Sequence, residues 1–266
     1  MGILNVTPDS FSDGGKYSGN CAIERGLNLF HEGADIVDVG GESSRPGAIP
    51  VSLDEELSRV IPVVDALAKN GIPVSVDTTK REVMQAALDS GASMINDIHA
   101  LQGLDKDFLA KSDAAVCLMH MKGNPMTMQL APSYNSVVDE IKAFLIERIE
   151  AAASMGIAKE RLLIDPGFGF GKTLEQNLEL VRHLDAFRET GIPVLAGLSR
   201  KSMLGAITGR AVNERIHASV AASLLAVAKG ASVVRVHDVA ATKDALVVYH
   251  AIEGKKWEED ISARTA

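Results

Sequence analysis

The strongest constraint on the fold is a regular alternation of short apolar segments with longer amphipathic ones. Eight apolar or β-branched runs of strand length occur along the chain, and segments with apolar residues at helical spacing separate them. We expect strands at 2–6, 35–40, 72–77, 93–97, 114–120, 161–166, 192–200 and 232–237, and helices at 22–32, 53–69, 81–90, 104–111, 137–155, 174–189, 214–229 and 240–252. Eight βα units predict an α/β fold, a single (β/α)8 TIM barrel, with a doubly wound open sheet as the alternative.

The length and composition suit one large domain. With 266 residues, of which 46% are hydrophobic, the chain can bury a sizeable core. No linker, composition shift or switch-point motif divides it, which favours the barrel over the open sheet. We therefore expect residues 1–266 to form one barrel domain.

Charge and cysteine content narrow the functional classes. The formal net charge of −8 disfavours nucleic acid and anionic membranes as partners. The apolar runs are too short to span a bilayer, and no basic segment followed by an apolar one opens the chain. Cys21 and Cys117 are far apart and lack metal-ligand spacing, so we expect a reducing, cytoplasmic location.

Polar residues end the predicted strands, on the side where barrel enzymes carry their chemistry. Asp77, Asn96 and Asp165 place two carboxylates and an amide on otherwise apolar strands, where they need polar partners. Such a face matches a flat heterocycle with an amidine-like donor edge. A helix cap or a salt bridge explains either carboxylate alone equally well.

Cations gather at the same predicted rim of a chain whose net charge is negative. They are Arg45, Arg200, Lys201, Arg235 and His237. Any one of them alone is compatible with a solvated surface charge, but together they predict a site for phosphate or diphosphate. The side-chain oxygens of Asn5, Asp9 and Asp13 could ligate a magnesium ion shared with that phosphate.

The stretch DPGFGFGKT (165–173) looks like a nucleotide-phosphate loop but lacks its spacing. A P-loop needs a glycine five positions before Gly171, where this chain has Pro166, which has no amide hydrogen to donate. We therefore predict that Asp165 is the working residue of the stretch and that Lys172 is peripheral.

Three further residues near the strand ends carry weaker signals. Met119 and Phe170 are candidates for walls of the site, although such residues beside strand ends are more often core. His120 lacks metal-ligand spacing, and we expect a hydrogen-bonded structural histidine there. No Ser/His/Asp order or partnered cysteine indicates a protein nucleophile.

Eight motifs, in order and on the predicted strand ends, resemble those of the dihydropteroate synthase family of the folate pathway. They are GILNVTPDSFSDGG (2–15), DVGGESSRPG (38–47), SVDT (75–78), IND (95–97), CLMHMKGNPMTMQ (117–129), LIDPGFGFGK (163–172), GLSRKS (197–202) and RVHDV (235–239). The resemblance covers nearly the whole chain. It implies a pterin-binding barrel that joins 6-hydroxymethyl-7,8-dihydropterin diphosphate to 4-aminobenzoate, giving 7,8-dihydropteroate and pyrophosphate.

The resemblance also implies roles for the matching residues. Those expected to hold the pterin are Asp77, Asn96, Asp165 and Lys201. Those expected to handle the diphosphate are Asn5, Arg45, Arg235 and His237, with Asn5 also on Mg²⁺. Those expected to line the 4-aminobenzoate site, which sulfonamide drugs would share, are Phe11, Ser44, Pro46, Lys201 and Ser202. The implied catalytic set is Asp77, Asp165, Lys201, Arg235 and His237, and the implied assembly is a homodimer through late helices such as 214–229.

Two features depart from the family pattern, and two other functions compete with it. Ser44 stands where the family more commonly has threonine. The family also usually has a segment before its first strand, and because this chain begins at that strand, we expect a less covered barrel floor. A pterin-dependent methyltransferase would share SVDT and IND but has no diphosphate chemistry to use Arg45 or the VTPDSFSDGG loop. A pterin-binding module without catalysis is the other alternative.

Overall fold

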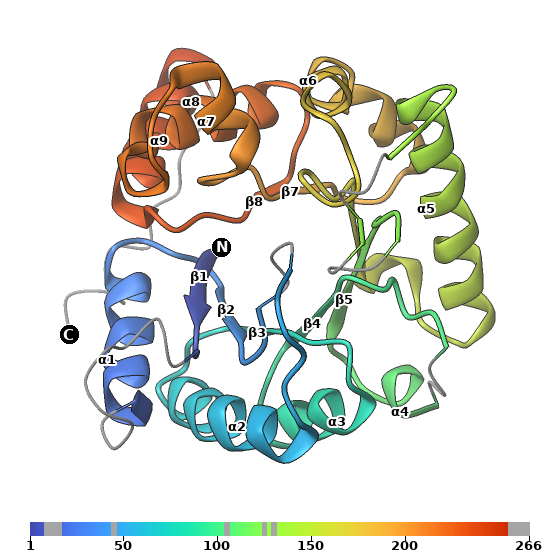
Figure 1. The fold of residues 1–266 in the computed structure, drawn as a ribbon. Helices are drawn as coiled ribbons and strands as arrows, with labels where there is room; N and C mark the ends of the chain where they lie inside the picture. The colour runs from blue at the N-terminus through green and yellow to red at the C-terminus, as the bar shows by residue number, and fades with distance from the viewer. Residues whose placement is uncertain (8–17, 44–46, 104–106, 124–126, 129–131, 255–266) are drawn as a thin grey trace.

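The eight expected strands are all present in the computed structural model, which describes residues 1–7, 18–43, 47–103, 107–123, 127–128 and 132–254 (Figure 1). They are β1 (Gly2–Asn5), β2 (Val37–Gly40), β3 (Val74–Asp77), β4 (Met94–Asp97), β5 (Ala115–Met119), β6 (Leu162–Asp165), β7 (Leu195–Ala196) and β8 (Val233–Val234). Each lies within its predicted range. The difference in length is largest for β7 and β8, which have two residues each.

The strands close into a ring. Strands β1 to β6 pair in sequence order, β7 pairs with β8, and all these pairs are parallel. Parallel bridges between Ile164 and Val194 and between Gly2 and Val236 join the two groups at both edges. At the second junction the Ile3 N–H donates to Val236 O at 2.9 Å. The predicted barrel is therefore confirmed, and the open-sheet alternative is wrong.

Helices surround the ring on its outside (Figure 1). They are α1 (Ser18–His31), α2 (Leu53–Lys69), α3 (Arg81–Asp89), α4 (Asp107–Ala110), α5 (Val137–Ser154), α6 (Leu174–Arg182), α7 (Ser202–Thr208), α8 (Ile216–Ala228) and α9 (Val239–Ile252). The predicted helix at 174–189 is instead α6 followed by a 3-10 segment, Leu184–Thr190. Helix α7 was not predicted, because its seven residues are too few to show a helical period before Gly209 ends it.

Alternate strand residues face opposite sides of the barrel wall. Val37, Val74 and their neighbours pack with helix residues such as Leu67 in the main hydrophobic cluster, outside the ring. Met94, Cys117 and Leu195 form a separate buried cluster with Met1 in the interior. The polar strand residues whose side chains also point into the barrel lie closer to the C-terminal ends of the strands than this cluster does. No helix in the described ranges has both the length and the apolar character needed to cross a bilayer.

Candidate active site

Two carboxylates and a guanidinium group from different strands form the buried centre of the candidate site. Arg235, just after β8, donates from Nε to Asp38 Oδ2 at 2.5 Å and from Nη2 to Asp77 Oδ2 at 2.8 Å. Asn96 Nδ2 also donates to Asp38 Oδ2, at 3.3 Å. Arg235 and Asp38 are 197 positions apart in the sequence, and only barrel closure brings them together.

The charges of this centre do not balance, because two carboxylates share one guanidinium. Burial raises the pKa of Asp77 to about 7, although Arg235 opposes the shift. Burial also disfavours the charge on Arg235, but Asp38 and Asp77 outweigh it and raise the pKa of the guanidinium. The other Asp38 oxygen, Oδ1, is buried without a hydrogen-bond partner among the described residues. Both features suit a ligand that presents N–H groups to the barrel interior.

Asp165 brings a third carboxylate to the interior from the end of β6. Its Oδ1 accepts a hydrogen bond from Gly167 N at 2.7 Å. Its Oδ2 faces Gly197, where an added Cβ would lie 3.9 Å away. Burial raises the pKa of Asp165, and the Gly167 N–H and the ammonium groups of Lys201 and Lys172 oppose the shift.

The glycine-rich loop after β6 is built around Lys172, which is buried with 3% exposure. Its Nζ donates to Gly167 O at 2.7 Å and to Phe170 O at 2.9 Å, and lies 3.1 Å from His120 Nδ1. Three glycines of the loop have φ between 64° and 79°, which lets the backbone curl around the ammonium group. Lys172 therefore lies inside its own loop, where backbone carbonyls take the donors that a P-loop lysine gives to phosphate. These contacts are consistent with the prediction that Lys172 does not bind the anion.

The expectation of a hydrogen-bonded, structural His120 is confirmed by this contact. Burial, with the nearby Lys172, lowers the pKa of His120 to about 3. Burial lowers the pKa of Lys172 to about 7, while Asp165 opposes that shift. A neutral imidazole at His120 carries no charge that would repel Lys172, which is consistent with the 3.1 Å between their nitrogens.

A small apolar cluster lies beside the loops that follow β5 and β6. Phe170 and Met119 pack there with Ile98 and Met128, apart from the other two apolar clusters. Lys201 Nζ lies 4.1 Å from the centroid of the Phe170 ring, a cation–π contact. The structure therefore brings Met119, Phe170 and Lys201 together, as the sequence analysis placed them.

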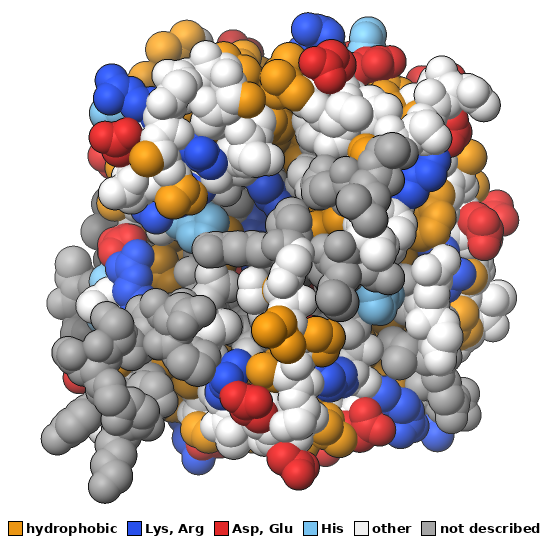
Figure 2. All heavy atoms as spheres, in the orientation of Figure 1, with side chains coloured by type: hydrophobic (Ala, Val, Ile, Leu, Met, Phe, Trp, Pro, Cys, Tyr) orange, Lys and Arg blue, Asp and Glu red, His pale blue; other side chains and the backbone are white. Residues whose placement is uncertain are grey.

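The remaining predicted cations divide into two groups. Ser199 Oγ lies 3.0 Å from His237 Nδ1 and also accepts the His237 backbone N–H, which fixes the ring at the mouth. Arg200 instead pairs with Asp238, at 2.5 and 3.0 Å, so its charge is not directed at the predicted anion site. Figure 2 shows basic and histidine side chains near the middle of the face viewed, over β7 and β8.

The other predicted site residues lie at the rim or outside the described residues. Asn5 ends β1, half-buried and in register with Gly40, and the exposed Ser202 opens α7. The predictions outside the described residues concern Phe11, Ser44, Arg45, Pro46, Asp9 and Asp13. In the described part of the chain, no group of three or more His, Cys, Asp or Glu side chains is arranged to hold a metal ion.

Comparison with known proteins decides the family. The model of the pterin binding enzyme family matches residues 1–237. A dihydropteroate synthase of Neisseria meningitidis serogroup B is 50% identical over 261 residues, which cover 95% of this chain and 92% of the relative. The chain belongs to the dihydropteroate synthase family. The resemblance that the eight motifs indicated is confirmed.

Solved dihydropteroate synthases share the whole barrel with this chain. One from Xanthomonas albilineans, solved with 4-aminobenzoic acid, is 53% identical with a TM-score of 0.91, over 96% of this chain and 93% of the other. One from Yersinia pestis, in complex with a sulfonamide drug, is 45% identical with a TM-score of 0.91, over 96% and 94%. Both alternatives at the sequence level, a methyltransferase and a module without catalysis, are disfavoured by these matches.

Asp38 is a residue of the candidate site, among the described residues, that the sequence analysis missed. It is fully buried and touches both Arg235 and Asn96. The alternation of side chains along a strand could have identified Asp38. It lies two residues before Gly40, and Gly40 pairs with Asp77, so the side chains of Asp38 and Asp77 point to the same side of the wall. The sequence analysis considered mainly the last residues of each strand, and Asp38 lies two residues before the end of β2.

Proposed function

We propose that the barrel mouth catalyses the dihydropteroate synthase reaction, the joining of 6-hydroxymethyl-7,8-dihydropterin diphosphate to 4-aminobenzoate with release of pyrophosphate. The observation that carries this proposal is the buried set of acceptors around Arg235, in a chain of this family. Asp38, Asp77 and Asp165 converge on one interior with the Asn96 amide. Such an arrangement costs stability unless a ligand with several N–H donors occupies it.

The pterin would lie across this interior. Asp165 Oδ2 would accept from the aminopyrimidine edge, which pairs with a carboxylate through two parallel N–H groups. Asp77 and Asn96 would bind the opposite edge of the ring, and the unpartnered Asp38 Oδ1 would offer one more acceptor. Phe170 and Met119 would form an apolar wall for the ring, beside the Lys201 ammonium.

The diphosphate would lie at the mouth near β8 and β1. His237, held by Ser199, and Arg235 would neutralise its charge, together with Arg45 from the β2–α2 loop. Asn5 would supply one oxygen ligand, which fits Mg²⁺, because this ion commonly uses few protein ligands and takes the rest from water and substrate phosphates. When bound, Mg²⁺ would stabilise the negative charge of the departing pyrophosphate.

The residues then act by binding and charge stabilisation. Arg235 and His237 stabilise the leaving pyrophosphate, and the electron-rich dihydropterin carries the positive charge left on its methylene carbon. The weakly basic amine of 4-aminobenzoate attacks that carbon and loses a proton. No protein nucleophile takes part. Lys201 would lie between the two substrates, because it contacts Phe170 on the pterin side and directly precedes Ser202 at the start of α7, where 4-aminobenzoate or a sulfonamide would bind with Phe11, Ser44 and Pro46.

The same proposal includes the assembly and location of the protein. We propose one barrel domain over residues 1–266 and a homodimer that buries exposed apolar side chains of α8 and α9, such as Leu225, Val248 and Ile252, which are 57–77% exposed. Cys21 and Cys117 are both free thiols, which supports a reducing, cytoplasmic location.

Pyrophosphate release by the wild type and by Asp165→Asn tests the function. The amide keeps the acceptor for Gly167 N but loses the charge that pairs with the pterin edge, so we expect a loss of at least about 10²-fold in kcat/KM, roughly 3 kcal/mol. Release that needs both substrates supports the synthase. Unchanged turnover in the variant would show that Asp165 does not bind the pterin, and a folded, pterin-binding wild type without release would be a binding module.

A further inference from the structure

The turn after β7 contains a strained residue directly before a predicted site residue. The Lys201 N–H donates to Leu198 O at 3.3 Å, which closes a four-residue turn. Arg200, the third residue of this turn, has a φ of 56°, a conformation that such turns usually give to glycine or asparagine. Strained residues of this kind persist only where their surroundings hold them, and they are common at functional sites. The contacts that hold Arg200 therefore indicate the role of the turn.

Three contacts hold Arg200, two of them from the start of α8. Its N–H donates to Ser219 Oγ at 2.9 Å, and its carbonyl accepts from Arg215 Nη1 at 3.1 Å. Its guanidinium pairs with Asp238, just before α9, at 2.5 and 3.0 Å. Ser219 Oγ also donates to Arg215 O at 2.7 Å, which connects the two α8 contacts to each other. The backbone and the side chain of the strained residue are thus both fixed.

Arg215 also connects the two ends of α7. Its Nη1 donates to Lys201 O, at 3.3 Å, at the N-terminal end of α7, and its Nε donates to Arg210 O, at 2.9 Å, after the C-terminal end. Between these carbonyls the guanidinium lies against Gly205, where any Cβ would overlap it. Because the guanidinium presents its N–H donors in one rigid plane, it holds the surrounding carbonyls in fixed directions.

The position of Lys201 in the barrel mouth depends on this backbone. Its stem packs on the glycine-rich loop, since a Cβ added to Gly169 would lie 3.2 Å from Lys201 Cδ. Its Nζ lies 4.1 Å from the centroid of the Phe170 ring. Burial raises the pKa of Asp165, and the Lys201 ammonium opposes that shift. A lysine side chain has much rotamer freedom to lose, so it keeps such a position only if its backbone is fixed.

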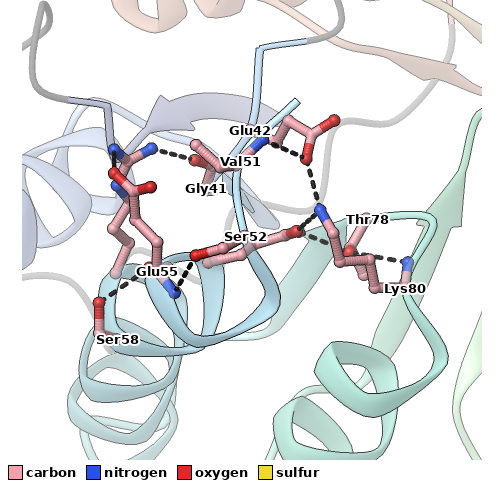
Figure 3. A network of polar contacts seen from close by, with 10 residues as sticks. Gly41, Glu42, Val51, Ser52, Glu55, Ser58, Thr78 and Lys80 are labelled. Carbon is pink, nitrogen blue, oxygen red and sulfur yellow. Dashed lines mark hydrogen bonds and ion pairs between the residues drawn. The ribbon is translucent and has the colours of Figure 1, made fainter. Parts of the chain in front are cut away.

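A second polar network at the mouth has a different character. Where the β2–α2 loop meets the end of β3, Lys80 Nζ lies 2.5 Å from Glu42 Oε2 and 2.5 Å from Glu56 Oε2 (Figure 3). That network pairs charges, and none of the residues labelled in Figure 3 has a positive φ. The contacts of Arg215 instead hold a strained backbone directly before a predicted site residue, which favours a functional role for them.

We propose that Arg215 is a positioning residue, which holds the bend at Arg200 and thereby places the Lys201 ammonium beside Phe170, between the two substrates. The proposal rests on the proposed function, which assigns Lys201 to the site. In this role Arg215 acts through Lys201 and needs no contact with either substrate.

Three variants test the proposal. Arg215→Met removes the contacts with the three carbonyls. Gly205→Ala favours the helix by itself but displaces the flexible guanidinium, so it removes the same contacts in a protein that is expected to fold. Arg161→Met is the matched control, because Arg161 donates to Ala114 O and Leu109 O, each at 2.8 Å, on the other side of the barrel from the mouth, before β5 and β6.

The first readout is kcat/KM for the pterin diphosphate in pyrophosphate release. We expect Arg215→Met and Gly205→Ala to lower it about 10- to 100-fold, the cost of a small misplacement of a binding group. Arg161→Met should keep the wild-type value, although both arginine variants lose stability in urea unfolding because carbonyl groups lose their donors. An unchanged kcat/KM in a folded Arg215→Met, or an equal loss in Arg161→Met, would overturn the proposal.

A double-variant cycle separates positioning from general damage. In a Lys201→Met background, the loss of Arg215 should change kcat/KM by less than about threefold, because the group that it positions is gone. Ser199, earlier in the turn, is held separately by its bonds to His237. Losses that multiply in the double variant would show that Arg215 does not act through Lys201.

The position of Lys201 also has a spectroscopic readout that needs no activity. The Phe170 ring shifts the NMR resonance of the Lys201 methylene next to Nζ, and Phe170→Leu measures this shift by removing it. We expect the shift to be lost in Arg215→Met and Gly205→Ala and kept in Arg161→Met; its persistence in the first two would contradict the proposal. A wild type that releases no pyrophosphate would refute the proposed function, and this resonance would still decide whether Arg215 places the ammonium group.

Discussion

Replacement of Asp77 tests the charge arrangement of the site, because a buried carboxylate that shares its guanidinium partner should destabilise the ligand-free protein. Asp77 shares Arg235 with Asp38, and its side chain is only 13% exposed. Replacement by asparagine keeps an oxygen for the 2.8 Å bond from Arg235 and removes one of two negative charges that face one positive charge. We therefore expect Asp77→Asn to stabilise the protein while it destroys pterin binding.

The magnitude follows from the pKa of Asp77, which burial raises from 3.8 to about 7. A carboxyl whose folded pKa is raised contributes stability below its unfolded pKa and loses it as the pH rises through the folded value. A shift of about 3 units corresponds to roughly 4 kcal/mol at 1.36 kcal/mol per unit. The raised pKa thus lowers the unfolding free energy of the wild type by up to about 4 kcal/mol between pH 4 and 8. Asparagine does not ionise, so the unfolding free energy of the variant does not fall for this reason.

The assay is urea unfolding, followed by far-UV circular dichroism, of both proteins from pH 4 to 8.5 without ligand. We expect the two to differ by less than about 1 kcal/mol at pH 4 and the variant to be about 2–4 kcal/mol more stable at pH 8. Asp65→Asn, on the exposed face of α2, makes the same chemical change and should differ from the wild type by less than about 0.5 kcal/mol throughout. A difference between Asp77→Asn and wild type that does not grow with pH would refute the reasoning.

Three other predictions address the glycine-rich loop and the metal. Burial lowers the pKa of Lys172 to about 7, so the wild type should gain stability as the pH rises from 7 toward 10, and Lys172→Met should lack that rise in the same unfolding titration; equal slopes would contradict a buried ammonium. Gly167→Ala, whose Cβ would meet His120 O at 1.9 Å, should cost at least about 3 kcal/mol of unfolding free energy, whereas Gly191→Ala, with the same φ of 71° and open space, should cost about 1 kcal/mol. Chelation of Mg²⁺ should abolish pyrophosphate release, and Asn5→Ala should raise the Mg²⁺ concentration needed for half-maximal rate; release that persists in chelator would exclude the metal from the reaction.

Much of the fold was readable from the sequence because its signals are local. Helical and strand periodicity depend on neighbours within a few residues, and eight such units leave few topologies. Parallel strands also place their C-terminal ends at one mouth, so Asp77, Asn96, Asp165 and Arg235 could be assigned to one site from their positions alone. The motifs on those ends identified the family. The seven-residue helix α7 gave no period to detect.

The tertiary structure decided where each side chain points and which group it pairs with. Arg200 and Arg235 are both cations after a strand, yet one pairs with Asp238 and the other enters the barrel to join Asp38 and Asp77. Lys172 was expected to be peripheral, and the structure shows it as a buried donor to carbonyl groups of its own loop. These outcomes depend on contacts between residues far apart in the chain, and on burial, which sets the cost of each charge. A sequence pattern contains neither the long-range contacts nor the burial, because both exist only once the ring of strands has closed.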